Sequence, residues 1–273
     1  MNINLGQWLL GKSLLGVVVR SLLFVYLALN LFAFFFAERM IFLPPVPTYQ
    51  DSSEILKLTT RNGKQISALY LPNPTATFTI LYSHGNGSDL GTSRAVLEEI
   101  KRIGFSVFAY DYQGYGTSQG TPSEQNTYQD IDAAYAYLTQ ALRIPADRII
   151  LYGFSVGSGP SLDLATRQPV AGIILEGAFT STFRVVTHWP ILLLDRFRNL
   201  DKIQSIQRPI LIIHGKLDRV IPFWHSQTLY QYANEPKQFF PVEEADHNNL
   251  IYAAGQQYGK TLQNFAQQIQ PQP

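Results

Sequence analysis

The sequence predicts an α/β domain built on a mostly parallel sheet, preceded by a hydrophobic N-terminal segment. From residue 54 onward, short runs rich in β-branched and aromatic residues alternate with longer amphipathic runs. Apolar strands separated by helices are typical of a parallel sheet that helices cover on both faces. The N-terminal segment is recognised by an uncharged run, SLLFVYLALNLFAFFFA, which extends from Ser21 to Ala37.

The composition excludes several classes of protein. With 46% hydrophobic, 13% aromatic and 15% charged residues, the 273-residue chain is neither disordered nor of low complexity. The 21 basic residues nearly balance the 20 acidic ones, so a nucleic-acid partner is not supported. Cysteine is absent, which excludes disulfides and a thiol nucleophile. Without an H-E-x-x-H, Walker or G-x-G-x-x-G motif, we expect no metal and no cofactor.

We interpret residues 1–40 as a single-pass membrane anchor, because an uncharged run of this length reaches the short end of the ~17–25 residues that cross a bilayer. A cleaved signal peptide fits less well, since Phe36 lies within the stretch where cleavage requires small residues. A buried helix of a soluble domain is the other alternative, but the run has no polar face. Lys12 and Arg20 precede the run and Arg39 follows it. The positive-inside rule then leaves the N-terminus in the cytoplasm and the rest of the chain on the non-cytoplasmic side.

The connector after the anchor reads FLPPVPTYQ, and its three prolines favour an extended segment. We place the domain boundary here, so that residues 41–273 form one catalytic domain. A hairpin is expected over residues 54–60 and 64–72, turned at Asn62-Gly63. The later strands are expected at 77–85, 105–112, 148–155, 171–179, 209–215 and 237–243. The helices are expected at 93–103, 123–142, 156–167, 224–233 and 249–269.

The strongest motif is G-x-S-x-G, at Gly153-Phe154-Ser155-Val156-Gly157. It follows a predicted strand and opens a predicted helix, which is the context that a nucleophilic serine requires on this kind of sheet. The sharp turn needs small residues on both sides and presents the hydroxyl above the carboxyl edge of the strands. The motif therefore makes Ser155 the candidate nucleophile.

A serine nucleophile needs a base, and the base needs an orienting acid. His247 follows the last predicted strand, which is the loop that carries a triad base. Asp218 lies just beyond the strand at 209–215, and Glu176 is the alternative acid. The chain order Ser155, Asp218, His247 is that of α/β-hydrolases. The remaining histidines are interpreted as structural, packing or surface residues: His84, His188, His214 and His225.

The tetrahedral intermediate of acyl transfer needs donors for its oxyanion. One donor is expected from the backbone N–H of Val156, directly after the nucleophile. The second is expected from the Gly-rich loop His84-Gly85-Asn86-Gly87, and we choose the N–H of Asn86. In the same segment, Ser88 or Asp89 is expected to cap the helix that follows.

Several linked segments resemble the membrane-associated serine hydrolases of the α/β-hydrolase-domain class, in the branch that includes protein depalmitoylases, and their bacterial relatives. The resemblance covers YSHGNGSDLG, YDYQGYGTSQGTPSE, DIDAAYAYL, RIILYGFSVGSGPSLDLA, HGKLDRVI and ADHNNL. It implies an α/β-hydrolase fold and carries the nucleophile to Ser155, the acid to Asp218 and the base to His247. Two features depart from it: the chain has no lipid-bearing cysteine cluster, and Asp246 stands where relatives commonly have glycine.

The substrate is expected to be an acyl compound. Residues 180–208 separate two strands where α/β-hydrolases insert a lid, and Trp189 to Leu194 make its short apolar part. An open site beside a bilayer suits long-chain esters or thioesters, including lipid-like substrates and acylated proteins. Two alternatives stay open: a serine peptidase or amidase on short peptides, and a catalytically silent, membrane-held interaction protein.

Overall fold

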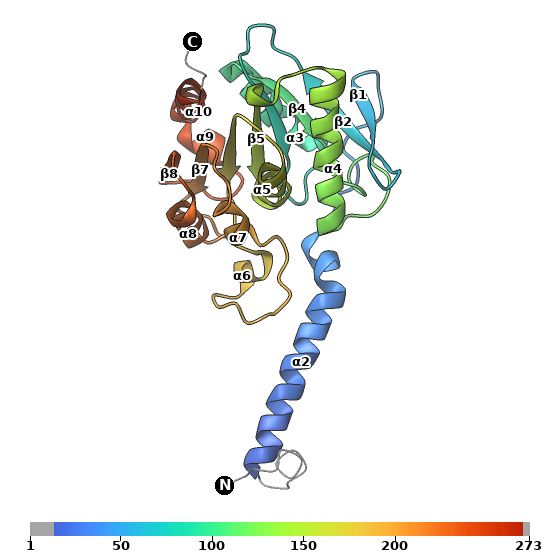
Figure 1. The fold of residues 1–273 in the computed structure, drawn as a ribbon, viewed down its shortest axis with the longest axis vertical. Helices are drawn as coiled ribbons and strands as arrows, with labels where there is room; N and C mark the ends of the chain where they lie inside the picture. The colour runs from blue at the N-terminus through green and yellow to red at the C-terminus, as the bar shows by residue number, and fades with distance from the viewer. Residues whose placement is uncertain (1–13, 270–273) are drawn as a thin grey trace.

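The fold of the chain, taken from a computed structural model that describes residues 14–269, confirms the α/β-hydrolase architecture (Figure 1). Within these residues, eight strands form one sheet in the order β1-β2-β4-β3-β5-β6-β7-β8. The pairs β1–β2 and β2–β4 are antiparallel, and the remaining pairs are parallel. The strands are β1 Ile55–Thr59, β2 Gln65–Leu71, β3 Thr79–Ser83, β4 Ser106–Tyr110, β5 Ile149–Phe154, β6 Gly172–Glu176, β7 Ile210–Gly215 and β8 Lys237–Val242.

Helices cover both faces of the sheet, because each central strand sends alternate side chains to opposite sides. In β3, Leu81 packs into one core, whereas Ile80 and Tyr82 pack into the other. The first core is covered by α4, α5, α7 and α8, and the second by α3, α9 and α10. The α-helices are α2 Leu14–Ile41, α3 Leu90–Ile103, α4 Glu124–Ala136, α5 Ser158–Arg167, α6 Thr182–Val186, α7 Asn199–Ile203, α8 Trp224–Tyr232, α9 Leu250–Ala254 and α10 Gln256–Gln268.

The ends of the helices depend on local caps and on one glycine. α3 begins earlier than expected, because Asp89 accepts a hydrogen bond from the N–H of Thr92 and the Thr92 hydroxyl accepts one from the N–H of Asp89. At α4, the Ser123 hydroxyl accepts a hydrogen bond from the N–H of Asn126 and caps the helix close to its predicted start at residue 123. The prediction of one closing helix over residues 249–269 is wrong. The structure has two helices there, α9 and α10, which are separated at Gly255, whose φ of 52° only glycine adopts readily.

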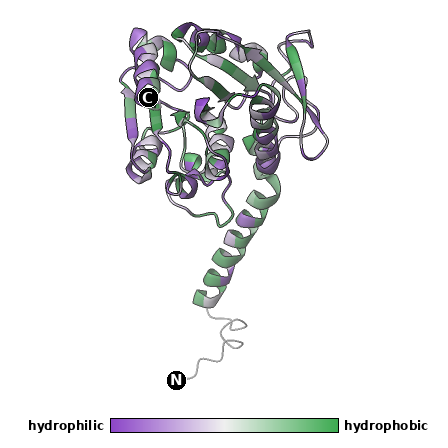
Figure 2. Ribbon diagram, turned by 45° about the horizontal axis from the view of Figure 1, so that its top comes forward, coloured by the Kyte–Doolittle hydropathy of each residue, from purple (hydrophilic) through white to green (hydrophobic). Residues whose placement is uncertain are grey.

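The N-terminal helix α2 projects from the catalytic domain as a stalk (Figure 1). It is longer than the uncharged run, and at about 1.5 Å per residue its 28 residues extend for about 42 Å. Its most apolar part has a mean hydropathy of 2.1, so it is long and apolar enough to cross a membrane. Figure 2 shows a mostly hydrophobic colour along it, and side chains such as Phe24 and Phe35 are exposed. Lys12, on which part of the orientation argument depends, lies outside the described residues.

Packing into the domain starts at the end of α2, where Ile41 packs against the first core. Phe42 is only 4% exposed, and its ring lies 6.0 Å from that of Phe197. Further along the connector, the N–H of Thr48 donates to Asp89. We propose the division of the chain into an anchor, residues 1–40, and a catalytic domain, residues 41–273.

The lid extends from the domain on the same side as α2 (Figure 1). It contains two short helices, α6 and α7, that the sequence did not predict. The lid also contacts α2: the Tyr26 hydroxyl donates to the carbonyl of Ile191 at 3.0 Å, and the Asn30 side chain accepts from the N–H of Leu193 at 2.9 Å. The apolar part of the lid therefore lies alongside the N-terminal helix.

Candidate active site

Ser155 lies at the sharp turn between β5 and the helix that follows it. Its φ of 53° is in the left-handed region, which is strained for a residue with a side chain. The turn packs closely on β3, since a Cβ at Gly157 would lie 2.1 Å from the carbonyl oxygen of Ser83. Only glycine permits this approach. The two glycines of the motif thus allow the strained turn, and the turn holds the Ser155 hydroxyl at the carboxyl end of the central strands.

The structure brings the three predicted triad residues together, although they come from three separate loops. The Nε2 atom of His247 lies 2.9 Å from the Ser155 hydroxyl. The Nδ1 atom of His247 lies 2.7 Å from Oδ2 of Asp218. All three residues are buried, with 5% to 8% of each exposed. A hydroxyl, an imidazole and a carboxylate in this order can transfer the hydroxyl proton to the ring and stabilise the charge that forms there.

Asp218 is held as a carboxylate by several donors. Its Oδ1 atom accepts hydrogen bonds from the N–H groups of Val220 and Ile221, at 2.9 and 2.7 Å. Burial acts to raise the pKa of Asp218, but the hydrogen bonds from His214 and His247 outweigh it and lower the pKa well below its ordinary value. The acid therefore stays ionised and oriented toward His247.

Glu176, the alternative acid, has other partners. It ends β6, and its carboxylate accepts hydrogen bonds from the hydroxyls of Tyr152 and Tyr258. Burial raises the pKa of Glu176, which favours the neutral acid. An acid that binds two tyrosines is poorly suited to orient His247, so the geometry favours Asp218 over Glu176.

The other histidines have contacts of a structural kind. His214 contacts the carbonyl of Ile221 at 2.9 Å and lies 3.2 Å from Asp218, so it supports the loop of the acid. His84 lies 2.8 Å from the carbonyl of Gly85. His225 is buried against Trp224, and burial lowers its pKa to about 3, which keeps it neutral. His188 is exposed.

The loop of residues 84–87, which is predicted to supply the second oxyanion donor, lies directly beside the nucleophile. A Cβ at Gly85 would lie 2.7 Å from the ring of Phe154 and 3.5 Å from the Cβ of Ser155. Val156 follows Ser155 in the first turn of a 3₁₀ helix, where backbone N–H groups have no partner within the helix. The sequence predicts a role for the backbone N–H of Asn86, but it gives no sign of the side-chain contacts that Asn86 makes with the end of α2. No short-range sequence pattern could have indicated that contact.

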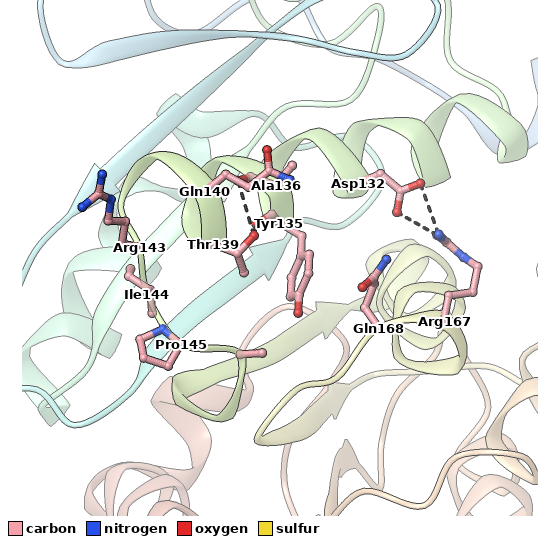
Figure 3. A pocket seen from close by; sticks show the side chains of 11 residues that line it. Asp132, Tyr135, Ala136, Thr139, Gln140, Arg143, Ile144, Pro145, Arg167 and Gln168 are labelled. Atoms are coloured by element: carbon pink, nitrogen blue, oxygen red, sulfur yellow. Dashed lines mark hydrogen bonds and ion pairs between the residues drawn. The ribbon is translucent and has the colours of Figure 1, made fainter.

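Two cavities lie away from the triad. One, of about 660 Å³, is lined by residues such as Tyr135, Thr139 and Gln168, next to the ion pair of Arg167 and Asp132 (Figure 3). It lies near the amino end of β5 and the end of α5, whereas Ser155 lies at the carboxyl end of β5. The other is an apolar groove of about 720 Å³ between α2 and the lid. Among residues 14–269, no group of three or more His, Asp or Glu side chains is placed to hold a metal ion.

A serine at a strained strand-to-helix turn, backed by a histidine and a carboxylate on this sheet, defines a serine hydrolase of the α/β-hydrolase fold. The family profile described as serine aminopeptidase, S33, matches residues 74–200. Alpha/beta hydrolase domain-containing protein 17B of Xenopus tropicalis is 36% identical over an alignment of 266 residues. The match covers 85% of this chain and 91% of the relative. The protein of the same name from Homo sapiens matches with the same identity and coverage. The chain therefore belongs to the family of alpha/beta hydrolase domain-containing proteins 17.

Solved structures share the fold at lower sequence identity. An esterase of Pyrococcus furiosus superposes with a TM-score of 0.71 at 16% identity, covering 84% of this chain and 98% of the esterase. An esterase of Exiguobacterium antarcticum superposes with a TM-score of 0.61 at 17% identity, covering 77% of this chain and 98% of that chain. At these identities the likeness shows the fold alone.

Proposed function

We propose that this hydrolase is anchored in a membrane by α2 and cleaves acyl ester or thioester bonds through Ser155, His247 and Asp218. The observation that carries the proposal is the continuous hydrogen-bonded series from the serine hydroxyl to the aspartate, with steps of 2.9 and 2.7 Å. The strained turn at Ser155 and the low pKa of Asp218 support the same assignment.

The reaction proceeds in two halves. As the Ser155 oxygen attacks the acyl carbonyl, its proton passes to Nε2 of His247, while Asp218 stabilises the imidazolium. The carbonyl oxygen becomes an oxyanion that accepts hydrogen bonds from the N–H groups of Val156 and Asn86. Collapse breaks the bond to the alcohol or thiol, which leaves with the proton from His247, and the acyl group stays on Ser155. Water then attacks by the same route, which releases the acid and restores the serine.

The groove between α2 and the lid lies away from the triad, and it supports a lipid-like substrate by its apolar chemistry rather than by contact with Ser155. The groove has a volume of about 720 Å³ and is almost entirely apolar. It is lined by Phe24, Leu27, Ala28, Asn30, Leu31, Phe34, Leu193 and Leu194. Burial of each methylene contributes about 0.8 kcal/mol, so such a surface favours long chains over short ones. The substrate class includes lipid-like esters and acylated proteins at a membrane.

The catalytic domain is proposed to lie on the non-cytoplasmic side. Lys12 and Arg20 precede the uncharged run, and only Arg39 follows it closely. Basic residues remain preferentially in the cytoplasm during insertion. This assignment concerns topology alone and does not affect the proposed chemistry.

A second candidate function is hydrolysis of amide bonds in short peptides. It is favoured by the family profile over residues 74–200, which is described as a serine aminopeptidase. The same three residues can cleave esters and amides, because both reactions pass through an acyl-enzyme. A series of p-nitrophenyl esters and aminoacyl p-nitroanilides, assayed side by side, separates the two functions by the ratio of their kcat/KM values.

The proposed function is tested with the full-length protein in detergent, by hydrolysis of p-nitrophenyl esters and by labelling with a fluorophosphonate. Ser155→Ala should abolish both, because the variant lacks the nucleophilic oxygen. Ser161→Ala is the matched control: it removes a nearby buried hydroxyl on α5, whose contact with Ser83 is a weak one at 3.4 Å. Full labelling of Ser155→Ala would overturn the assignment. A wild type that neither hydrolyses esters nor reacts with the probe would favour a catalytically silent interaction protein.

A further inference from the structure

We propose that the side chain of Asn86 is a positioning element. It holds the loop of residues 84–87, here called the oxyanion loop, against the backbone at the end of α2. The inference rests on the proposed function, in which the backbone N–H of Asn86 stabilises the oxyanion. It gives the backbone groups of Ile41 and Leu43 a positioning role, so that the end of α2 is a structural support of the active site.

The first observation is a pair of hydrogen bonds between one side chain and the backbone that leaves α2. The Asn86 amide donates from Nδ2 to the carbonyl of Ile41 at 2.6 Å. Its Oδ1 atom accepts from the N–H of Leu43 at 2.9 Å. The side-chain amide of Asn86 therefore donates one hydrogen bond to the backbone at the end of α2 and accepts one from it, as a peptide group does in a sheet. Ile41 is the last residue of α2, where carbonyl groups have no partner within the helix.

The second observation is that the other side of the same amide is fixed by a buried tyrosine. The Tyr115 hydroxyl donates to Oδ1 of Asn86 at 2.6 Å. Tyr115 is fully buried, and burial raises its pKa, so the hydroxyl keeps the proton that it donates. At the start of the loop, the hydroxyl of Tyr112 donates to the carbonyl of His84 at 2.7 Å. The rings of Tyr112 and Tyr115 lie 5.5 Å apart in an edge-to-face arrangement, so one aromatic pair supports both ends of the loop.

The third observation places this support within reach of the reacting atoms. Gly85, the neighbour of Asn86, lies so close to the nucleophile turn that a Cβ there would be 3.5 Å from the Cβ of Ser155. A rotation of the loop about Gly85 would move the N–H of Asn86 relative to the carbonyl that Ser155 attacks. Catalysis by an oxyanion donor depends steeply on such displacements, and loss of one donor costs about 10²–10³ in turnover.

The exposure of Asn86 argues against a role in core stability. The residue is exposed, so shortening its side chain leaves no internal cavity. Loss of its three hydrogen bonds should therefore change the position of the loop more than the stability of the fold. This difference separates a positioning role from a merely structural one.

The test uses the full-length protein in detergent with p-nitrophenyl butyrate, a short ester that does not depend on the acyl groove. Asn86→Ala should lower kcat by about 10-fold, a partial loss of one oxyanion donor, while KM changes less than twofold. The thermal midpoint should fall by only about 5 °C, because the buried Tyr115 hydroxyl loses its acceptor but no core packing is lost. Leu43→Pro removes the N–H that donates to Asn86 and should lower kcat in the same way. Leu43→Ala is its matched control, because it keeps the N–H and should retain wild-type kcat.

The double variant Asn86→Ala/Leu43→Pro decides whether the two residues act through one contact. If they do, its kcat should equal that of the more impaired single variant rather than the product of both losses. Losses that multiply would overturn the proposed link, as would a full kcat in Asn86→Ala. A fall in kcat that only follows a large drop in thermal midpoint would indicate a structural role and overturn it too. An absence of Ser155-dependent hydrolysis in the wild type would instead remove the proposed function, and the positioning role with it.

Discussion

Asp246 joins the loop of the base to the loop of the acid through Arg219. Its Oδ2 atom accepts a hydrogen bond from Nε of Arg219 at 2.7 Å. Its Oδ1 atom accepts from the backbone N–H of Arg219 at 3.0 Å and from that of His247 at 2.8 Å. Asp218 and His247, the neighbours of this pair, are thereby held at a fixed separation.

The first prediction concerns this link. Arg219→Ala and Asp246→Gly should each lower kcat by about two- to threefold, since an exposed ion pair contributes little and the triad itself is unchanged. In 1 M salt the difference from wild type should shrink, because salt screens exposed charges. Lys216→Ala breaks the comparable exposed pair with Glu243 and is the control that should keep full kcat. A faster Asp246→Gly enzyme would contradict the prediction.

The second prediction concerns the choice of acid. Asp218→Asn should lower kcat by roughly 10⁴, because an amide no longer holds His247 in the productive tautomer or stabilises its charge. Glu176→Gln should retain most activity, since Glu176 binds Tyr152 and Tyr258 instead of the base. The measurement is kcat on a p-nitrophenyl ester, with thermal midpoints to verify folding. An active Asp218→Asn together with an inactive Glu176→Gln would reverse the assignment.

The backbone architecture and the candidate triad were accessible from the sequence because short-range patterns encode them. Apolar strands alternate with amphipathic helices, and Gly153 and Gly157 mark the turn that a nucleophile needs. The chain order then favours an acid in the loop after β6 or β7 and a base in the loop after β8. Asp89 and Ser123 were also readable as caps, because each acts on residues only three positions away.

Features that depend on distant packing could not be predicted in this way. Asn86 meets Ile41 across 45 positions of sequence, and no periodic pattern connects them. The helices α6 and α7 have five residues each, too few for a helical repeat to stand out. Such contacts follow from the folded arrangement and leave no local signature.

The third prediction concerns the length of the acyl chain. Leu193 and Leu194 line the groove beside α2. Leu192 lines only a second, more polar cavity, which Leu193 also reaches. For the wild type, kcat/KM should rise along an ester series from two to about sixteen carbons, measured below micelle-forming concentrations. Leu193→Ser/Leu194→Ser should flatten the series and spare the acetate ester, because each buried methylene is worth about 0.8 kcal/mol.

The control for the groove is Leu192→Ser, which changes a neighbouring lid leucine outside the groove and should keep the chain-length preference. Leu193 and Leu194 are 70% and 53% exposed, so the double variant should stay folded, and a loss of activity on all chain lengths alike would contradict the prediction. A wild type that prefers acetate would contradict the proposed groove and favour small esters or peptides.

The fourth prediction concerns the membrane. The full-length protein should stay in the membrane pellet after washing with sodium carbonate, because a spanning helix is not held by charge. Protease added outside intact cells or spheroplasts should degrade the catalytic domain, since the bias of basic residues leaves the N-terminus inside. A cytoplasmic protein in the same cells is the control for intactness. Protection of the domain would reverse the orientation, and release by carbonate would contradict a spanning anchor.

The fifth prediction concerns the pH dependence of stability and follows from Asp130. This carboxyl is fully buried on α4 and accepts hydrogen bonds from the backbone and side chain of Gln113, at 2.9 and 2.8 Å. Burial raises its pKa to about 7, although the contacts with Gln113 act to lower it. Between the ordinary pKa near 3.9 and pH 7, the folded protein therefore holds a proton that the unfolded chain has released.

Because the folded state binds the extra proton, Asp130 should make the protein less stable as pH rises through this window, by about 4 kcal/mol at most. Asp130→Asn cannot ionise, so the stability of the wild type relative to this variant should fall from pH 4 to pH 7 and level off above it. The measurement is the urea midpoint of both proteins in detergent at several pH values. A wild type that gains relative stability with rising pH would mean that the folded protein keeps Asp130 ionised, because Gln113 then outweighs burial.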